Sequence, residues 1–268
     1  MDTQLLHNKF RRIDARLKVV PDAGVVRVKL DIGRDRKGEY FDLHVRRDLR
    51  VAADAIDVRP FDRHLLLAVR DEDRLGLPTG GAQRFLCGHD ERAWFVAAVP
   101  EARAASNVRE AMEALKPWPV RAAQNQARVP FDHRNRRHNA AFVRQGEWFF
   151  VPASGASVPP DAILRNEPLV RTGGKPHRAE FLHRAGGELV YVNPQTGRVL
   201  SMNRYEQFLR DMPGGLAGYR PQRRNMTVMV KGRISHPDHQ SIVLRDWHAV
   251  YMNTEHQSEA MRVVAFMD

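Results

Sequence analysis

The chain has 268 residues but only one cysteine, Cys87, and no apolar segment long enough to cross a membrane. A single thiol excludes an intrachain disulfide and a zinc site built from several cysteines, so a reducing compartment fits. A membrane-spanning helix needs about 20 consecutive apolar residues, and the N-terminal stretch is polar and charged. The composition therefore predicts a cytoplasmic protein with neither a secretion signal nor a membrane partner.

The sequence also lacks the motifs that identify common enzyme classes. Its glycine-rich segments have neither the Lys-Ser/Thr ending of a Walker loop nor the strand–GxGxxG–helix context of a dinucleotide site. Ser154 has no recognisable partner base. Cys87 is close to His89, but it continues the apolar pattern of Phe85 and Leu86 and is expected to be a buried core residue. No single motif therefore assigns a function.

Lysine is scarce as well, with 7 residues against 36 arginines, and the formal net charge is +11. Residues 1–120 carry 22 basic and 19 acidic side chains, whereas residues 121–268 carry 21 and 13. A nucleic-acid partner would therefore meet the second half of the chain. The competing interpretation is that GC-rich coding produces the arginine bias without any selection for binding.

Hydrophobic periodicity predicts mostly strands. In the first half, apolar residues alternate over 26–32 and 41–45, residues 64–69 form a short apolar run, and 84–87 and 93–99 flank a hairpin turn. A helix is expected from Ser106 to Lys116, with Pro117 as its end. Residues 117–130 are framed by prolines and are interpreted as a linker or a long connection. These patterns place a first unit before about residue 120.

The second half is expected to open with two hairpins, turning at Gln145-Gly146 and at Gly186-Gly187, and to contain a short helix from Asn203. Strands follow over 226–234, 240–244 and 247–252, with a last apolar segment at 262–266. The predicted fold class is α+β, predominantly antiparallel β with few short helices. Two subdomains are expected, a mixed β/α N-terminal unit at 1–120 and a basic β-rich C-terminal unit at 121–268.

Histidines concentrate in residues 121–268, which hold eight of the twelve. His236, Asp238 and His239 lie at the turn between two predicted strands, and His248 begins the next. Imidazole and carboxylate suit a divalent metal such as Zn or Mn, so His236, Asp238 and His239 are the candidate metal ligands. The same three residues with His248 are the candidate catalytic set. Two alternatives stay open, a purely structural His-Pro-Asp-His β-turn and metal-free acid–base chemistry.

Basic residues cluster near the start and middle of the C-terminal unit. Arginine can donate two hydrogen bonds to one phosphate, and an exposed aromatic ring next to arginine can stack on a base. The residues expected to contact nucleic acid are Arg134, Arg136, Arg137, Tyr219, Arg223, Arg224, Lys231 and Arg233.

The leading functional hypothesis is a nucleic-acid-associated protein that binds phosphates through this basic surface. A further hypothesis is that the same protein has a His/Asp site that hydrolyses a phosphodiester. The alternative from another class is a non-catalytic adaptor or assembly subunit that binds a protein partner. A third is a metal-dependent hydrolase for a small phosphorylated or acidic substrate, which requires a closed pocket between His236 and His248. The sequence leaves open whether the chain is an enzyme.

Overall fold

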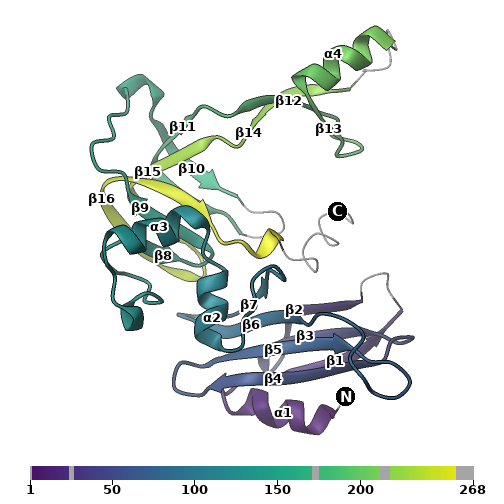
Figure 1. Cartoon of the computed structure of the whole chain (residues 1–268). Helices are drawn as coiled ribbons and strands as arrows, with labels where there is room; N and C mark the ends of the chain where they lie inside the picture. Colours follow the sequence, from purple (N-terminus) through teal and green to yellow (C-terminus); the bar gives the residue numbers. More distant parts are fainter. Residues whose placement is uncertain (1, 24–26, 171–174, 212–217, 258–268) are drawn as a thin grey trace.

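The computed structural model describes residues 2–23, 27–170, 175–211 and 218–257 (Figure 1). Strands make up 49% of the structure, and they are accompanied by four short α-helices within these ranges, which confirms the predicted α+β fold dominated by antiparallel β. The predicted strand at 262–266 lies outside the described residues. None of the helices in the described ranges has the length and apolar content needed to cross a membrane.

Residues 3–99 form one helix and two sheets that share a core. β2 and β3 form the predicted hairpin, and β1 joins β3 in parallel. β4 to β7 form an antiparallel sheet in chain order. Phe10 from the helix, Phe41 from β3 and Leu67 from β5 are fully buried in one cluster. The elements are α1 (Thr3–Arg11), β1 (Leu17–Asp22), β2 (Val28–Asp35), β3 (Gly38–Arg46), β4 (Val51–Arg59), β5 (His64–Asp71), β6 (Gln83–Asp90) and β7 (Ala93–Val99).

Two helices follow where the sequence predicted one helix and a linker or long connection. The predicted helix is present as α2 (Val108–Ala114), although Asn107 rather than Ser106 caps it. The helix ends before Pro117, as expected. Pro117 then caps a second helix, α3 (Trp118–Gln126), and Pro119 lies in the first turn of that helix. A proline is tolerated there because that turn has no intrahelical partner for its amide. Residues 117–130 are therefore largely helical.

A six-stranded sheet forms the centre of the second half, in the order β10-β11-β15-β16-β9-β8. The hairpin predicted at Gln145-Gly146 joins β8 and β9. Val230 and Ile234 of β15 pack with Phe150 and Leu182 in the core of this sheet. The strands are β8 (Val143–Gln145), β9 (Trp148–Pro152), β10 (Leu164–Leu169), β11 (His177–Ala185), β15 (Thr227–His236) and β16 (His239–Met252).

The hairpin expected at Gly186-Gly187 is wrong, because β11 and the following β12 do not pair with each other. The two glycines instead carry the chain out of the six-stranded sheet into a second, three-stranded sheet, β13-β12-β14, which projects away from it (Figure 1). A side chain at Gly187 would place its Cβ 2.8 Å from the carbonyl oxygen of Arg224 on the returning strand. We call this projection, residues 186–224, the arm; it contains β12 (Glu188–Val192), β13 (Val199–Ser201), α4 (Met202–Asp211) and β14 (Arg220–Arg224).

Candidate metal centre

The turn between β15 and β16 brings two of the predicted ligands together. Pro237 and Asp238 form a two-residue loop, and His236 pairs directly with His239 across it. Directly opposed residues of an antiparallel pair project from the same face of the sheet. The two imidazole centroids are therefore only 4.8 Å apart. The β-turn that was considered as a purely structural alternative is what makes the two rings converge.

A third histidine, His177, completes the cluster. It is the first residue of β11, which lies beside β15 in the sheet, and its ring stacks on that of His236 with 4.2 Å between centroids. One ligating atom from each of His177, His236 and His239 lies within 4.8 Å of the others. Sequence patterns did not identify His177 as a ligand. The available signal was its place in the inward-facing pattern of β11, where His177 and Ala179 are both buried.

His177 is in an unusual electrostatic state for a histidine. It is only 1% exposed, and neither ring nitrogen has a hydrogen-bond partner among the described residues. Burial lowers the pKa of His177 to about 3, and the neighbouring His236 and His239 act in the same direction. The ring is therefore neutral at physiological pH and keeps a free lone pair, which is the state that metal coordination requires.

A carboxylate from the first half of the chain lies near His239. Oε2 of Glu91 is 3.6 Å from Nδ1 of His239, which is an ion-pair distance, and Nδ1 has no hydrogen-bond partner among the described residues. Nε2 is left for a ligand. Burial is the main cause that lowers the pKa of His239. A carboxylate at the second ring nitrogen is the usual support of a metal-binding histidine.

Gly146, in the β8–β9 turn, gives these nitrogens room. A Cβ there would lie 2.8 Å from Nε2 of His239 and 3.5 Å from Nε2 of His177. Both Nε2 atoms therefore face the same small space, which exists because residue 146 has no side chain. Its φ of +57° is in the left-handed region that favours glycine.

His236 is held by its own turn. Its Nε2 is 3.2 Å from the carbonyl oxygen of Lys175, and its Nδ1 accepts a hydrogen bond of 3.1 Å from the amide of Asp238. The first contact fixes the ring, and the second occupies the lone pair that a metal would use. Metal binding at His236 therefore has to displace the Asp238 amide.

Two residues of the predicted catalytic set lie outside the cluster. Both carboxylate oxygens of Asp238 bond to Nζ of Lys175, at 2.8 and 2.9 Å, and this contact lowers the pKa of Asp238. His248 pairs with Val230 and Pro152 much further along β16, and its Nδ1 contacts the carbonyl oxygen of Asp246. At about 3.3 Å per residue, roughly 25–30 Å of strand separates it from His239.

A cavity of about 200 Å³ opens beside the cluster, where Gly146 and His239 form part of its wall. β6, β7 and α2 from the first half line it together with the β8–β9 turn and residues near the end of β16. Its apolar wall includes Trp94, Phe95, Leu115, Phe142 and Phe149. The charged side chains that line it are Asp90, Lys116, Arg144, Glu147, Asp238 and Glu255.

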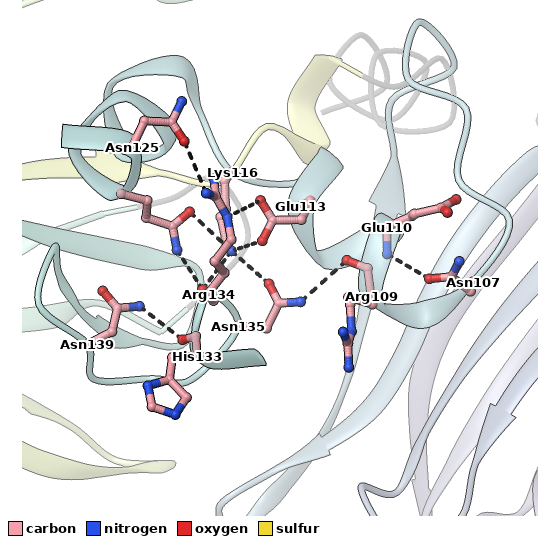
Figure 2. Close-up of polar contacts among 11 residues, drawn as sticks. Asn107, Arg109, Glu110, Glu113, Lys116, Asn125, His133, Arg134, Asn135 and Asn139 are labelled. Carbon is pink, nitrogen blue, oxygen red and sulfur yellow. Dashed lines mark hydrogen bonds and ion pairs between the residues drawn. The ribbon is translucent and has the colours of Figure 1, made fainter. Parts of the chain in front are cut away.

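Lys116 holds one side of this cavity in place. Its buried Nζ contacts Glu113 at 2.5 Å, and it lies 2.7 Å from both the carbonyl oxygen of Arg134 and Oδ1 of Asn135 (Figure 2). Burial lowers the pKa of Lys116 to about 8, although the contact with Glu113 opposes that change. Lys116 thus ties the loop after α3 to α2.

Two of the three predicted nucleic-acid contacts in that loop are engaged within the protein. The guanidinium of Arg134 donates to Asn125 and lies 3.5 Å from Glu113 (Figure 2). Arg137 contacts both Asp90 and Glu91. Only Arg136 is exposed without such a contact in the described structure.

The remaining predicted contacts are divided between two sheets. Lys231 and Arg233 belong to β15 in the six-stranded sheet, whereas Arg223, Arg224 and Tyr219 belong to the arm. Arg223 donates to the carbonyl oxygen of Gly186, and Arg224 pairs with Glu188 at 2.7 Å. The predicted basic residues therefore come from three places, the loop after α3, β15 and the arm.

No protein-family model matches the sequence, and comparisons with curated proteins and with solved structures give no match. A functional conclusion therefore depends on the chemistry of the residues described above.

Proposed function

We propose that His177, His236 and His239 bind one divalent transition-metal ion, and that the protein is a metal-dependent hydrolase whose reaction takes place in the adjoining cavity. The observation that carries this proposal is the convergence of the three imidazoles around a buried His177 whose two ring nitrogens lack hydrogen-bond partners among the described residues. Leaving buried polar atoms unpaired is costly, and a bound ion would satisfy one of them.

Zinc is the ion that suits these ligands best. Imidazole nitrogen binds Zn well, whereas Mn favours carboxylate and water oxygen. In a tetrahedral zinc site the nitrogens lie about 2.0 Å from the ion, so two of them are roughly 3.3 Å apart. The ligating atoms now lie within 4.8 Å of one another, so closing the site brings them together by up to about 1.5 Å, and His236 has to release the amide of Asp238.

A hydrolase fits the number of ligands. Catalytic zinc sites use three protein ligands and leave one position open, whereas structural sites have four. In such sites the metal polarises a carbonyl or phosphoryl oxygen and activates water. Of the three histidines, His239 lines the cavity, so a substrate bound there would lie next to the metal site on the side of His239 and Gly146. Of the hypotheses from the sequence, a metal-dependent hydrolase is the one that this geometry favours. The pocket expected between His236 and His248 is not where the cavity lies, because the cavity adjoins His239 and includes neither His236 nor His248.

The experiment is elemental analysis of the purified protein, with His177→Ala compared with His183→Ala. Both histidines lie on β11, but His183 contacts the carbonyl oxygen of Ala162 and is outside the cluster. We expect one equivalent of zinc in the wild type and in His183→Ala, and none in His177→Ala. Equal metal content in the two folded variants, or none in any of the proteins, would refute the metal centre.

A second candidate function is nucleic-acid binding by the arm, which we propose from its exposed charge. The described arm residues include six arginines, at 198, 204, 210, 220, 223 and 224, against three acidic residues, at 188, 206 and 211, and all nine are exposed. Exposed arginines release counterions when they contact phosphates, so binding should weaken log-linearly with salt.

The test is a salt titration of binding to single-stranded oligonucleotides. We expect the double variant Arg223→Gln, Arg224→Gln to lower the slope of log K against log salt by about 2, since each lost phosphate contact removes about 1. Arg34→Gln, Arg36→Gln, exposed in the first half, is the charge-matched control. If the affinity does not change with salt concentration, the result would favour the adaptor hypothesis, in which this surface binds a protein partner.

A further inference from the structure

The two cations that line the cavity are already neutralised by the protein. Lys116 Nζ is surrounded by the carboxylate of Glu113 and two further oxygen acceptors, so its three N–H groups are used. Arg144 lies 3.6 Å from the carboxylate of Asp90 and donates to the carbonyl oxygen of Gly146 at 3.3 Å. Neither cation is available to pair with an anionic substrate.

One carboxylate in the cavity wall is different. Glu147 follows Gly146 in the β8–β9 turn, and its side chain has no hydrogen bond or ion pair among the described residues. Glu147 therefore adds a negative charge to the cavity wall beside His239 that no described cation offsets. This charge opposes the entry of phosphate and carboxylate groups, and it offsets part of the positive charge that a bound divalent ion would bring.

The rest of the wall sets the size and polarity of the occupant. The aromatic residues Trp94 and Phe95 of β7 and Phe142 and Phe149 of the second half all contribute to the cavity wall. An apolar cavity of about 150 Å³ is sufficient for benzene. The volume of about 200 Å³ therefore accommodates one ring with a short substituent.

We infer that the cavity binds a small uncharged molecule with a single-ring apolar body and a donor atom directed at the metal site through His239, and that Glu147 excludes phosphorylated and acidic molecules. The inference rests on the proposed metal centre and narrows its substrate class. It also replaces the anionic substrate expected from the sequence, because the cationic residues of the wall are already paired.

The test uses the full chain loaded with cobalt, whose visible spectrum reports a new ligand. Three probes are titrated at about pH 8, where imidazoles are uncharged: N-benzylimidazole, N-methylimidazole and benzylphosphonate. The first two differ in the apolar body, whereas the first and third differ in the charge of the donor group. We expect N-benzylimidazole to bind at least about tenfold more tightly than either of the others.

Two variants separate the causes. Glu147→Gln removes the negative charge and should strengthen benzylphosphonate binding by about tenfold while it leaves N-benzylimidazole unchanged. Ala93→Phe fills part of the cavity from the start of β7 and should weaken N-benzylimidazole but not N-methylimidazole. Both variants should still take up one equivalent of cobalt.

The outcomes distinguish the two proposals. Tighter binding of benzylphosphonate than of N-benzylimidazole, or equal binding of the two imidazoles, in a protein that holds cobalt would overturn the inference and leave the metal centre intact. A chain that takes up no cobalt overturns the metal centre, and the inference with it.

Discussion

Glu91 and His239 come from opposite halves of the chain, yet the carboxylate of Glu91 lies 3.6 Å from Nδ1 of His239. Glu91 sits in the turn between β6 and β7 with a φ of +55°, which is unusual for a residue with a side chain. The same carboxylate accepts the amide of Gln240 and contacts Arg137. The first half of the chain thus places a negative charge beside a cluster whose three histidines all belong to the second half.

Glu91→Gln should weaken metal binding. Losing the charged partner of a metal-binding histidine typically costs about 10–100-fold in affinity, and we expect a change in that range. Competition with a chromogenic chelator measures it. Asp161→Asn, which removes an exposed carboxylate of the second half, should change nothing. If the two variants bind zinc equally well, Glu91 does not support His239.

Gly146→Ala should abolish metal binding, because its Cβ would lie 2.8 Å from Nε2 of His239. Gly155→Ala is a matched control, since Gly155 also has a positive φ but nothing lies within 4 Å of the position that a Cβ would take there. Backbone strain should cost both variants about 1 kcal/mol of folding free energy, seen as similar shifts in denaturation midpoint. A Gly146→Ala protein with full zinc content would show that the nitrogens do not use this space.

Asp238→Asn should keep its metal, whereas His236→Ala should lose it. The sequence placed both residues among the ligands, but the carboxylate of Asp238 is bonded to Lys175 and the cluster consists of histidines. Elemental analysis of the two folded variants decides this. Loss of zinc from Asp238→Asn would restore the predicted His-Asp-His ligand set.

The free energy of unfolding should rise between about pH 8 and pH 10.5 because of Lys116. Its pKa is lowered to about 8 in the folded protein from an ordinary value of 10.5. Between these values the unfolded chain binds the extra proton, so stability increases with pH, by at most about 1.4 kcal/mol per unit. Below pH 8 the cost of the buried charge is constant.

Urea unfolding of the wild type and of Lys116→Met across this range provides the measurement. The variant removes the ammonium from a buried site and should be less stable at every pH, because Glu113 and the neighbouring oxygens lose their partner. Its stability should nevertheless lack the rise that the wild type shows. An identical pH dependence in both proteins would mean that Lys116 titrates normally.

Local pattern was enough to predict much of the fold. The β2–β3, β6–β7 and β8–β9 hairpins were found because alternation and turn residues lie within a few positions of each other. The hairpin predicted at Gly186-Gly187 was wrong, because a glycine pair between two strands is also compatible with a bend that leads the chain into another sheet. Pairing of β11 with β15 and of β12 with β14 is non-local and leaves no short-range signal.

The site shows the same division. His236 and His239 were predicted because one short turn holds both, but the contribution of His177 depends on which strand lies next to β15. Asp238 was included because carboxylates bind metals, and only the position of Lys175 shows that it is already paired. The cavity combines residues of both halves, so no single stretch of sequence indicates it.

Trp148 begins β9 at the edge of the histidine cluster, with its indole ring centroid 6.3 Å from that of His177. An indole this close to a bound ion emits light that paramagnetic metals such as cobalt or copper quench at short range. The chain therefore carries its own optical probe of occupancy, and a titration could follow metal uptake in the unlabelled wild type.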